Sequence, residues 1–478
     1  MRLKPKLGLS RRRLLSAAMA PFVITPPLQA QTATADPLSF PADFVWGTST
    51  SCYQIEGAVN EDGRGKSIWD LFSHTPGRVK DGDTGDVACD HYHRWGEDID
   101  LLSAGNFSAY RFSIAWPRIL PLGRGVVAQR GLDFYERLID RLIAKGITPW
   151  VCLYHWDLPQ TLQDEGGWLN RETCAKFVDY ALVLAKRLGD RVERWAMFNE
   201  ANVHALFGHG IGQHAPGLTG LPNMLAAIHH QNLAQGRALQ ALRAERSNFK
   251  LGTIISLQPA RSSSDREEDR RAADRFDAMW NGACLDPLLH GSYPMLVSSD
   301  FASLIAEGDL VAMQQPIDYL GVNYYSPMYI EYAPQSLFRA WFGAAPKGTR
   351  FTAMGWPIDA GGLTDELLRL RDRYGNPEVY VTENGACYDD QLLATGSILD
   401  DDRVAYLRDH LAATSHALAA GVNVRGYFVW SLLDNFEWAE GYSRRFGVVY
   451  VDFKTLKRTP KSSYHWLAEF MKDQARKN

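Results

Sequence analysis

Two carboxylates carry the clearest chemical signal in the sequence, because each ends a short apolar run beside an Asn side chain. Glu383 closes a run within Val379 to Gly385, and Glu200 closes the run that begins at Trp195. Short β-branched and aromatic runs that stop at a turn are typical of buried strands. If both strands belong to one parallel sheet, their carboxyl ends open on the same face. The pattern therefore predicts paired carboxylates at the mouth of one barrel.

A single Glu at a strand end is usually solvated or ion-paired, whereas two beside Asn favour a functional pair. Here the sequence resembles glycoside hydrolase family 1, the retaining β-glycosidases, whose motifs stand as Asn199-Glu200 and Thr382-Glu383-Asn384-Gly385. The resemblance extends from about Phe40 to about Trp466. It implies an α/β fold, a single (β/α)8 TIM barrel with extended loops after the strands, spanning residues 36–478.

The resemblance also assigns roles around the two carboxylates. It implies that Glu383 is the nucleophile and Glu200 the general acid and base of a retaining β-glycosidase. Arg111, on the strand predicted at 109–117, alternates into the barrel, where an unpaired guanidinium would be costly. In the family this Arg pairs with the nucleophile, and the hydroxyl at the position of Tyr325 touches it. Both groups are expected to keep Glu383 ionised.

Retaining hydrolysis needs one ionised and one protonated carboxyl group, about 5 to 5.5 Å apart. The negative charge of Glu383 is expected to keep the proton on Glu200 near neutral pH. Once the glycosyl ester forms on Glu383, that charge is lost, and Glu200 then activates water as a base.

The family's sugar-binding positions are also present. Gln54 matches an amide that hydrogen-bonds the outer sugar hydroxyls, since one amide can donate to a hydroxyl and accept from its neighbour. Trp430 matches a platform under the sugar ring, with barrel filling as its alternative. The complete set that the resemblance implies for substrate binding is Gln54, His155, Trp156, Asn199, Asn323, Trp430, Glu437 and Trp438.

The predicted strands lie around 44–57, 109–117, 148–159, 195–200, 251–259, 317–326, 379–385 and 424–438, with helices at 132–145 and 171–188. The alternation of strands with helices and the lack of a linker favour one barrel. Ala201 departs from the family, which has Pro there, and the local loop is expected to be looser. The segment 332–356 matches the family least and is expected to shape the aglycone entrance.

Composition limits the partners. The chain has 478 residues and 14 Trp. Because its net charge is −4, it lacks the basic surface that is typical of a nucleic-acid-binding protein. We expect a small β-glucoside or oligosaccharide as partner and neither cofactor nor metal, and read His91 and His93, two apart on a predicted helix, as structural. The sequence leaves the oligomeric state open.

The N-terminus has the pattern of a targeting segment. Paired arginines in Ser10-Arg11-Arg12-Arg13-Leu14-Leu15 precede an apolar run that is too short to span a bilayer. The pattern resembles a twin-arginine export signal over residues 1–35, with cleavage after Ala30 or Ala35, and predicts a periplasmic protein without membrane insertion in its mature form. Because folded proteins use that route, the six scattered cysteines are expected to be mostly free and buried.

Several alternatives remain at this stage. A 6-phospho-β-glycosidase is disfavoured, because Glu437 would repel a phosphate at the sugar-recognition end. A transglycosylase differs only in how well its acceptor site excludes water. A non-catalytic sugar-binding protein is disfavoured because both Glu residues are present. Glucose is the favoured glycone, with galactose and fucose open.

Overall fold

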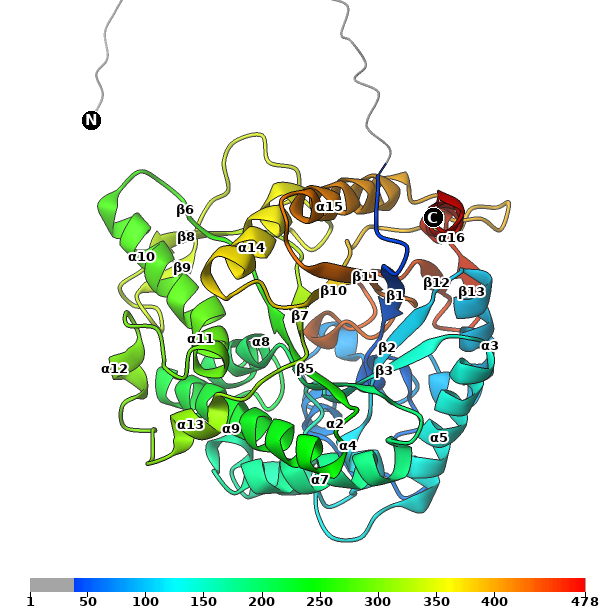
Figure 1. Cartoon of the computed structure of the whole chain (residues 1–478). Helices are drawn as coiled ribbons and strands as arrows, with labels where there is room; N and C mark the ends of the chain where they lie inside the picture. The colour runs from blue at the N-terminus through cyan, green and yellow to red at the C-terminus, as the bar shows by residue number, and fades with distance from the viewer. Residues whose placement is uncertain (1–37, 478) are drawn as a thin grey trace, which may run out of the picture. The chain divides into compact units, whose positions relative to one another are not determined.

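Eight parallel strands form a closed barrel in the computed structural model, which describes residues 38–477 (Figure 1). Around the barrel the strand order is β1-β11-β10-β7-β5-β4-β3-β2, the order of a (β/α)8 TIM barrel. The predicted fold is therefore confirmed. The barrel strands are β1 (Val45–Ser49), β2 (Ala109–Ser113), β3 (Thr148–Tyr154), β4 (Arg194–Asn199), β5 (Lys250–Ser256), β7 (Tyr319–Asn323), β10 (Val379–Asn384) and β11 (Val424–Trp430).

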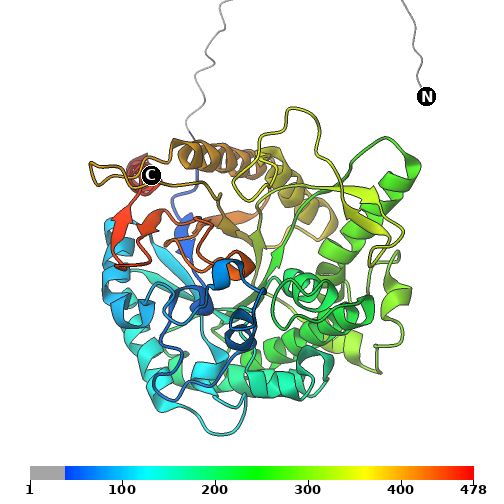
Figure 2. The same cartoon turned by 180° about the vertical axis from the view of Figure 1, so that it is seen from behind.

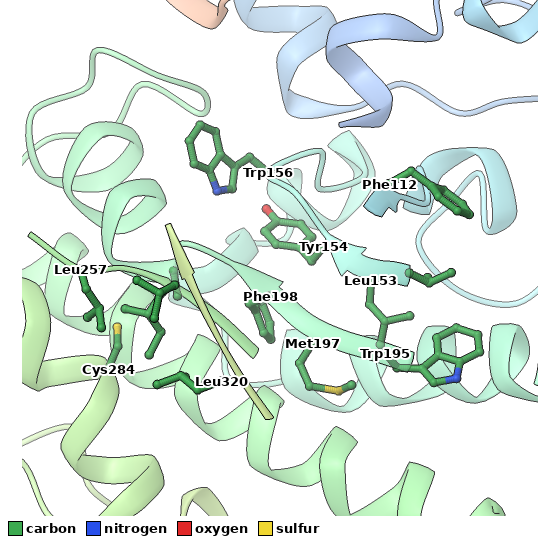
Figure 3. Close-up of a cluster of buried hydrophobic side chains, with 14 of the residues drawn as sticks. Phe112, Leu153, Tyr154, Trp156, Trp195, Met197, Phe198, Leu257, Cys284 and Leu320 are labelled. Atoms are coloured by element: carbon green, nitrogen blue, oxygen red, sulfur yellow. The ribbon is translucent and has the colours of Figure 1, made fainter. Parts of the chain in front are cut away.

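Helices surround the strands, and their apolar faces bury the outer side of the barrel (Figure 1). The longer ones are α3 (His91–Ala104), α5 (Gln129–Ala144), α7 (Thr173–Leu188), α9 (Leu221–Glu245), α10 (Glu267–Asp277), α14 (Ala360–Arg373), α15 (Asp401–Ala419) and α16 (Ser462–Lys477). Figure 3 shows part of the core between strands and helices, where Tyr154, Met197 and Phe198 pack together. None of the helices within residues 38–477 has both the length and the hydropathy needed to cross a membrane.

Long segments follow the carboxyl ends of the strands. Figure 2 shows the segments after β1, in blue, and after β11, in orange, lying over the centre of the barrel. The connections between the barrel strands also contain the short helices α1 (Cys52–Ile55), α2 (Ile68–Ser73), α4 (Trp116–Ile119), α6 (Gln160–Asp164), α8 (Ala201–Ala205), α11 (Ala283–Leu289), α12 (Ser298–Phe301) and α13 (Asp309–Met313). Small sheets are formed by β6 (Ala260–Ser262), β8 (Met328–Tyr332) and β9 (Ala340–Phe342), and by β12 (Val449–Val451) and β13 (Arg458–Pro460).

Aromatic rings fill the opposite end of the barrel. The Trp150 ring lies 4.6 Å from that of Tyr380, 5.1 Å from that of Phe428 and 5.2 Å from that of Tyr319. The Arg194 guanidinium covers Trp150 at 4.7 Å, a favourable position for a cation over an indole. We call these four rings the aromatic plug; it closes the amino-terminal end, so that chemistry is confined to the other face.

The structure also tests several local expectations. His91 is buried against Asp98, with 2.7 Å between Nδ1 and Oδ2, whereas His93 on the same helix is exposed. The six cysteines are all buried and unpaired, as expected. Ala201 begins helix α8, a position where Pro is well tolerated, so Ala and Pro fit the same local geometry there.

Candidate active site

Both candidate carboxylates follow an irregularity in strand pairing. The register between β4 and β5 shifts between Ala196 and Asn199, and the register between β10 and β7 shifts between Val381 and Glu383. On β4, Met197 and Phe198 consequently both pack in the outer core (Figure 3). The shift turns Asn199 toward the barrel interior, where it meets Arg111 of β2, since a bulge re-aims the side chains that follow it.

Glu383 is held by a cation and a hydroxyl. Arg111 Nη1 donates to its Oε1, and the Tyr325 hydroxyl donates to its Oε2 at 2.6 Å. Burial raises the pKa of Glu383, and the Arg111 charge and the Tyr325 hydrogen bond oppose that rise. Because both oxygens accept from fixed donors, Glu383 is the carboxyl group of the pair that this site stabilises as an anion.

Glu200 has a different environment. Its Oε1 accepts from Asn323 Nδ2 at 2.9 Å, and no ion pair reaches it among the described residues. Burial, followed by the charge of Glu383, raises the pKa of Glu200 to about 8. Its backbone has a φ of 48°, in the left-handed region that a non-Gly residue rarely adopts. Glu200 is therefore the protonated partner at neutral pH, held by a strained backbone.

The Asn residues orient the pair. Thr382 Oγ1 donates to Asn323 Oδ1 at 2.8 Å, which directs the Asn323 amide nitrogen at Glu200. Asn199 Oδ1 accepts from Arg111 Nη2 at 2.6 Å and from Asn323 Nδ2 at 3.0 Å. One hydrogen-bonded network thus links both carboxyl groups, so a change in the charge of either one alters the hydrogen bonding of the other.

Neutral polar groups border the network. Asn199 Nδ2 lies 3.0 Å from His155 Nε2. Burial and the nearby Arg111 charge lower the pKa of His155, so its imidazole is neutral and accepts this hydrogen bond. Trp156 follows with a φ of 75° and donates from Nε1 to the Asn199 carbonyl at 2.9 Å. His155 and Trp156 lie just past the end of β3, which stops at Tyr154.

Gln54 is anchored by neighbours to which the sequence assigned no role. Its Nε2 donates to Asn435 Oδ1 at 3.0 Å and approaches Glu437 Oε2 at 3.5 Å. The Ser51 hydroxyl donates to Gln54 Oε1 at 2.6 Å. Ser51 lies in the same polar segment as Gln54, and Asn435 lies in that of Glu437. Because a buried amide needs hydrogen-bond partners, these nearby polar residues were the signal in the sequence for the anchoring contacts.

Trp430, Glu437 and Trp438 come from β11 and the segment after it. The Trp430 and Trp438 rings lie 5.9 and 5.8 Å from that of His155. Burial, with the charges of Glu383 and Glu200, raises the pKa of Glu437 to about 8. A Cβ at Gly385 would stand 1.8 Å from the Trp430 carbonyl oxygen, so only Gly allows the two catalytic-face segments to approach this closely.

These side chains surround a cavity of about 900 Å³ at the carboxyl end of the barrel. Of the predicted site residues, those that line it are His155, Trp156, Glu200, Tyr325, Glu383, Trp430, Glu437 and Trp438. Gln54, Arg111, Asn199 and Asn323 lie behind this lining and hold it through the contacts above. The segment 332–356 contributes Phe342, Phe351 and Trp356 to the wall, and it contains strand β9 as well as loops.

Comparison with known proteins supports the interpretation of this cavity as the active site of a glycosidase. The model of glycosyl hydrolase family 1 matches residues 37–476. β-Glucosidase A of Thermotoga maritima is 46% identical over 439 residues, covering 91% of this chain and 98% of that protein. A bifunctional β-D-glucosidase/β-D-fucosidase of Bifidobacterium breve is 45% identical over 461 residues, covering 91% of this chain and 99% of that protein.

Solved structures agree with these sequences. The family 1 β-glucosidase of Thermotoga maritima superimposes with a TM-score of 0.88 at 45% identity, covering 92% of this chain and 99% of that one. The same enzyme has been solved in complex with glucoimidazole, with a TM-score of 0.88, 46% identity, and coverage of 91% and 99%. With a matched family model over nearly all described residues, this chain belongs to glycosyl hydrolase family 1.

Proposed function

We propose that the protein is a retaining β-glucosidase, which hydrolyses terminal, non-reducing β-D-glucosyl residues by double displacement. The observation that carries the proposal is the pair of buried carboxyl groups facing one cavity in opposite environments. Glu383 is paired with Arg111 and Tyr325, while Glu200 has a pKa of about 8 and contacts only neutral groups. This division supplies the nucleophile and the proton donor that retaining hydrolysis requires.

In the first step, a Glu383 oxygen attacks C1 of the glucosyl ring as the bond to the leaving oxygen breaks. Glu200 gives its proton to that oxygen, so the aglycone departs as a neutral alcohol. As the ester forms, Glu383 loses the negative charge that Arg111 and Tyr325 stabilise in the free enzyme. The products are a glucosyl ester on Glu383 and an ionised Glu200.

In the second step, water attacks C1 from the side that the aglycone left. Because the ester has removed the charge of Glu383, the pKa of Glu200 falls, and Glu200 takes a proton from the water. The ester bond breaks and returns its electrons to Glu383. Two inversions give a product with the original β configuration.

Glucose is the proposed glycone. In support, the T. maritima relative is solved with glucoimidazole, and in this chain Glu437 and Trp438 line the cavity, with Gln54 directly behind Glu437. The B. breve relative is named for both glucosidase and fucosidase activity, so we extend the proposal to β-fucosides, with β-galactosides as a further candidate.

Proton NMR of the first turnovers tests this mechanism. With residues 36–478 and an aryl β-D-glucoside, the β-anomer of glucose should appear first and the α-anomer only later, by mutarotation. An α-anomer that appears first would show a single displacement and contradict the role given to Glu383. A phosphorylated glucoside as parallel substrate should not be hydrolysed, because Glu437 lines the cavity where a phosphate would need a cationic partner.

The pH dependence of kcat/KM should have its alkaline limb near pH 8. Glu200 must be protonated in the free enzyme, so activity is present below a pKa of about 8 and is lost as pH rises through it. Glu437 titrates in the same range, so Glu437→Gln serves as the control. That variant should be slower but keep the limb; a limb that disappears with it would assign the limb to Glu437.

We also infer that the protein is exported to the bacterial periplasm through the twin-arginine route. The signal pattern lies within residues 1–35, outside the described residues, and six unpaired, buried cysteines suit a protein that folds in a reducing cytosol. Replacing Arg11 and Arg12 together by Lys should retain active enzyme in the cytosol of a host with this pathway. Unchanged periplasmic activity of that variant would contradict the inference.

A further inference from the structure

Among residues 38–477, Arg78 is the only Lys or Arg that lines the active-site cavity. It belongs to the segment after β1, between helix α2 and the short helix η1 (Lys80–Gly82), and it is exposed. Glu383 lines the same cavity but is only 3% exposed. Arg78 therefore lies at the opening of the cavity, toward which the leaving group of a substrate extends.

Neighbouring groups hold the guanidinium of Arg78 in place. Its Cζ lies 5.4 Å from the centre of the Phe72 ring, and its Nη1 donates to the Gly212 carbonyl at 3.3 Å. A Cβ at Gly217 would stand 3.6 Å from Cζ and Nη2, so the guanidinium also packs against that residue. A cation stacked on a ring in this way loses less freedom when it binds a ligand than a mobile one does.

The hydrogen-bonding edge of this guanidinium is available to a ligand. Only Nη1 donates to the protein, so Nε and Nη2 have no acceptor among the described residues, and no carboxylate there pairs with Arg78. Nε and Nη2 lie side by side on one planar edge. This edge can bind both oxygens of a carboxylate through two parallel hydrogen bonds.

The acidic residues of the cavity leave the charge of Arg78 without compensation at neutral pH. They are Glu200, Glu383, Glu437 and Glu440. Glu383 is paired with Arg111, and Glu440 accepts from Arg444 Nε at 3.1 Å. Burial is the main cause that raises the pKa of both Glu200 and Glu437 to about 8, so these two are largely neutral at pH 7. The cavity therefore favours an anion at its opening.

Aromatic side chains line the same opening. Phe351 is 51% exposed and Phe342 is 37% exposed, and both line the cavity together with Phe72 under the guanidinium. Such rings attract a flat aromatic group through stacked and edge-to-face contacts. A leaving group that joins an aromatic ring to a distal carboxylate matches both the rings and the cation.

On the basis of the proposed glucosidase function, we propose that Arg78 binds the carboxylate of an acidic aromatic leaving group, so that β-glucosides of hydroxylated aromatic acids are a substrate class of this enzyme. The glucosyl ring is linked to the phenolic oxygen, which Glu200 protonates. The free carboxylate at the far end of the aglycone contacts Arg78. The arginine acts on the binding of the leaving group and takes no part in the chemical steps.

The test compares Arg78→Gln with the wild type on two substrates, the phenolic β-D-glucoside of 4-hydroxycinnamic acid and the corresponding carboxamide. Glutamine keeps a polar side chain and removes the charge. We expect the ratio of kcat/KM for the acid to that for the amide to fall about fivefold, because an exposed charge-assisted contact is lost. The value for the amide should stay within about twofold. Differences in the reactivity of the two leaving groups cancel when this ratio is compared between enzymes.

Lys80→Gln is the matched control. Lys80 is exposed two positions farther along the same segment, and it does not line the cavity. Its substitution changes the net charge by the same amount, so it reports the effect of the overall field. The ratio should change by less than about 1.5-fold, since exposed charges beyond the contact distance are screened by salt. An equal change in Lys80→Gln and Arg78→Gln would overturn the proposal.

Salt provides a second measurement on the unaltered enzyme. Raising NaCl from about 20 mM to about 500 mM should lower kcat/KM for the acid about twofold to threefold and leave that for the amide unchanged. The proposal is wrong if the ratio of acid to amide is the same in Arg78→Gln as in the wild type, or if the wild type cleaves 4-nitrophenyl β-D-glucoside but neither hydroxycinnamic substrate. If the wild type also fails to cleave the nitrophenyl glucoside, the proposed glucosidase function fails instead.

Discussion

Replacing Glu383 with Ala is expected to lower the turnover of aryl β-D-glucosides by at least about 10⁴-fold, because no other group can form the covalent intermediate. The Arg111 guanidinium and the Tyr325 hydroxyl remain in place and would bind a small anion in the vacated space. Added azide should therefore restore turnover by attacking C1 directly. A single displacement inverts the configuration, so the rescued product should be the α-glucosyl azide.

Glu378→Gln is the matched control for this variant. Glu378 immediately precedes strand β10, on the opposite side of the barrel from the cavity, and accepts from the Tyr380 hydroxyl at 2.9 Å, a contact that Gln preserves. Activity within about twofold of the wild type is expected, as for a surface substitution. If Glu383→Ala kept near-native turnover without azide, Glu383 would not be the nucleophile.

Replacing Glu200 with Ala is expected to have an effect that depends on the leaving group. For poor leaving groups such as a sugar alcohol, loss of the general acid should lower kcat/KM by about 10² to 10⁴-fold. For 2,4-dinitrophenolate, which leaves without a proton, the fall in kcat/KM should be much smaller. Steady turnover should still be slow, since the ester on Glu383 then lacks a base to activate water.

Azide distinguishes this variant from the first. It needs no base, so it should react with the ester on Glu383 and release β-glucosyl azide, the product of two inversions. The two variants are thus expected to give azides of opposite configuration, measurable by NMR in one experiment. The same azide anomer from both variants would contradict the division of roles between Glu200 and Glu383.

The positions of the barrel strands were largely predictable, because each strand is a short apolar run with polar residues after it. The carboxylates at the ends of β4 and β10 could also be recognised from the sequence as a candidate pair. Their orientation could not be derived from alternation. Met197 and Phe198 both face the outer core, so a strict two-residue period fails before Asn199, and only the pairing between strands reveals that shift.

Anchoring contacts were the other part that the sequence could not supply. Gln54 and Asn435 are 381 positions apart in the chain and meet only because β1 and β11 are neighbours in the closed barrel. The predicted sugar-binding amides Gln54, Asn199 and Asn323 proved to be almost completely buried behind the lining. Whether a polar side chain at a strand end faces the cavity or supports a neighbour depends on packing that local patterns do not encode.

The aromatic plug has a consequence for the traffic of molecules through the enzyme. Because Trp150 and its neighbouring rings close one end of the barrel, substrate and products pass through the same opening at the carboxyl end, as far as residues 38–477 form the barrel. The aglycone lies toward the cavity opening and must leave before water can take its place. Glucose lies farther inside the cavity and leaves last. Free glucose that re-enters through the same opening occupies the binding position of the next glucosyl ring. We therefore expect glucose, the end product, to be a competitive inhibitor.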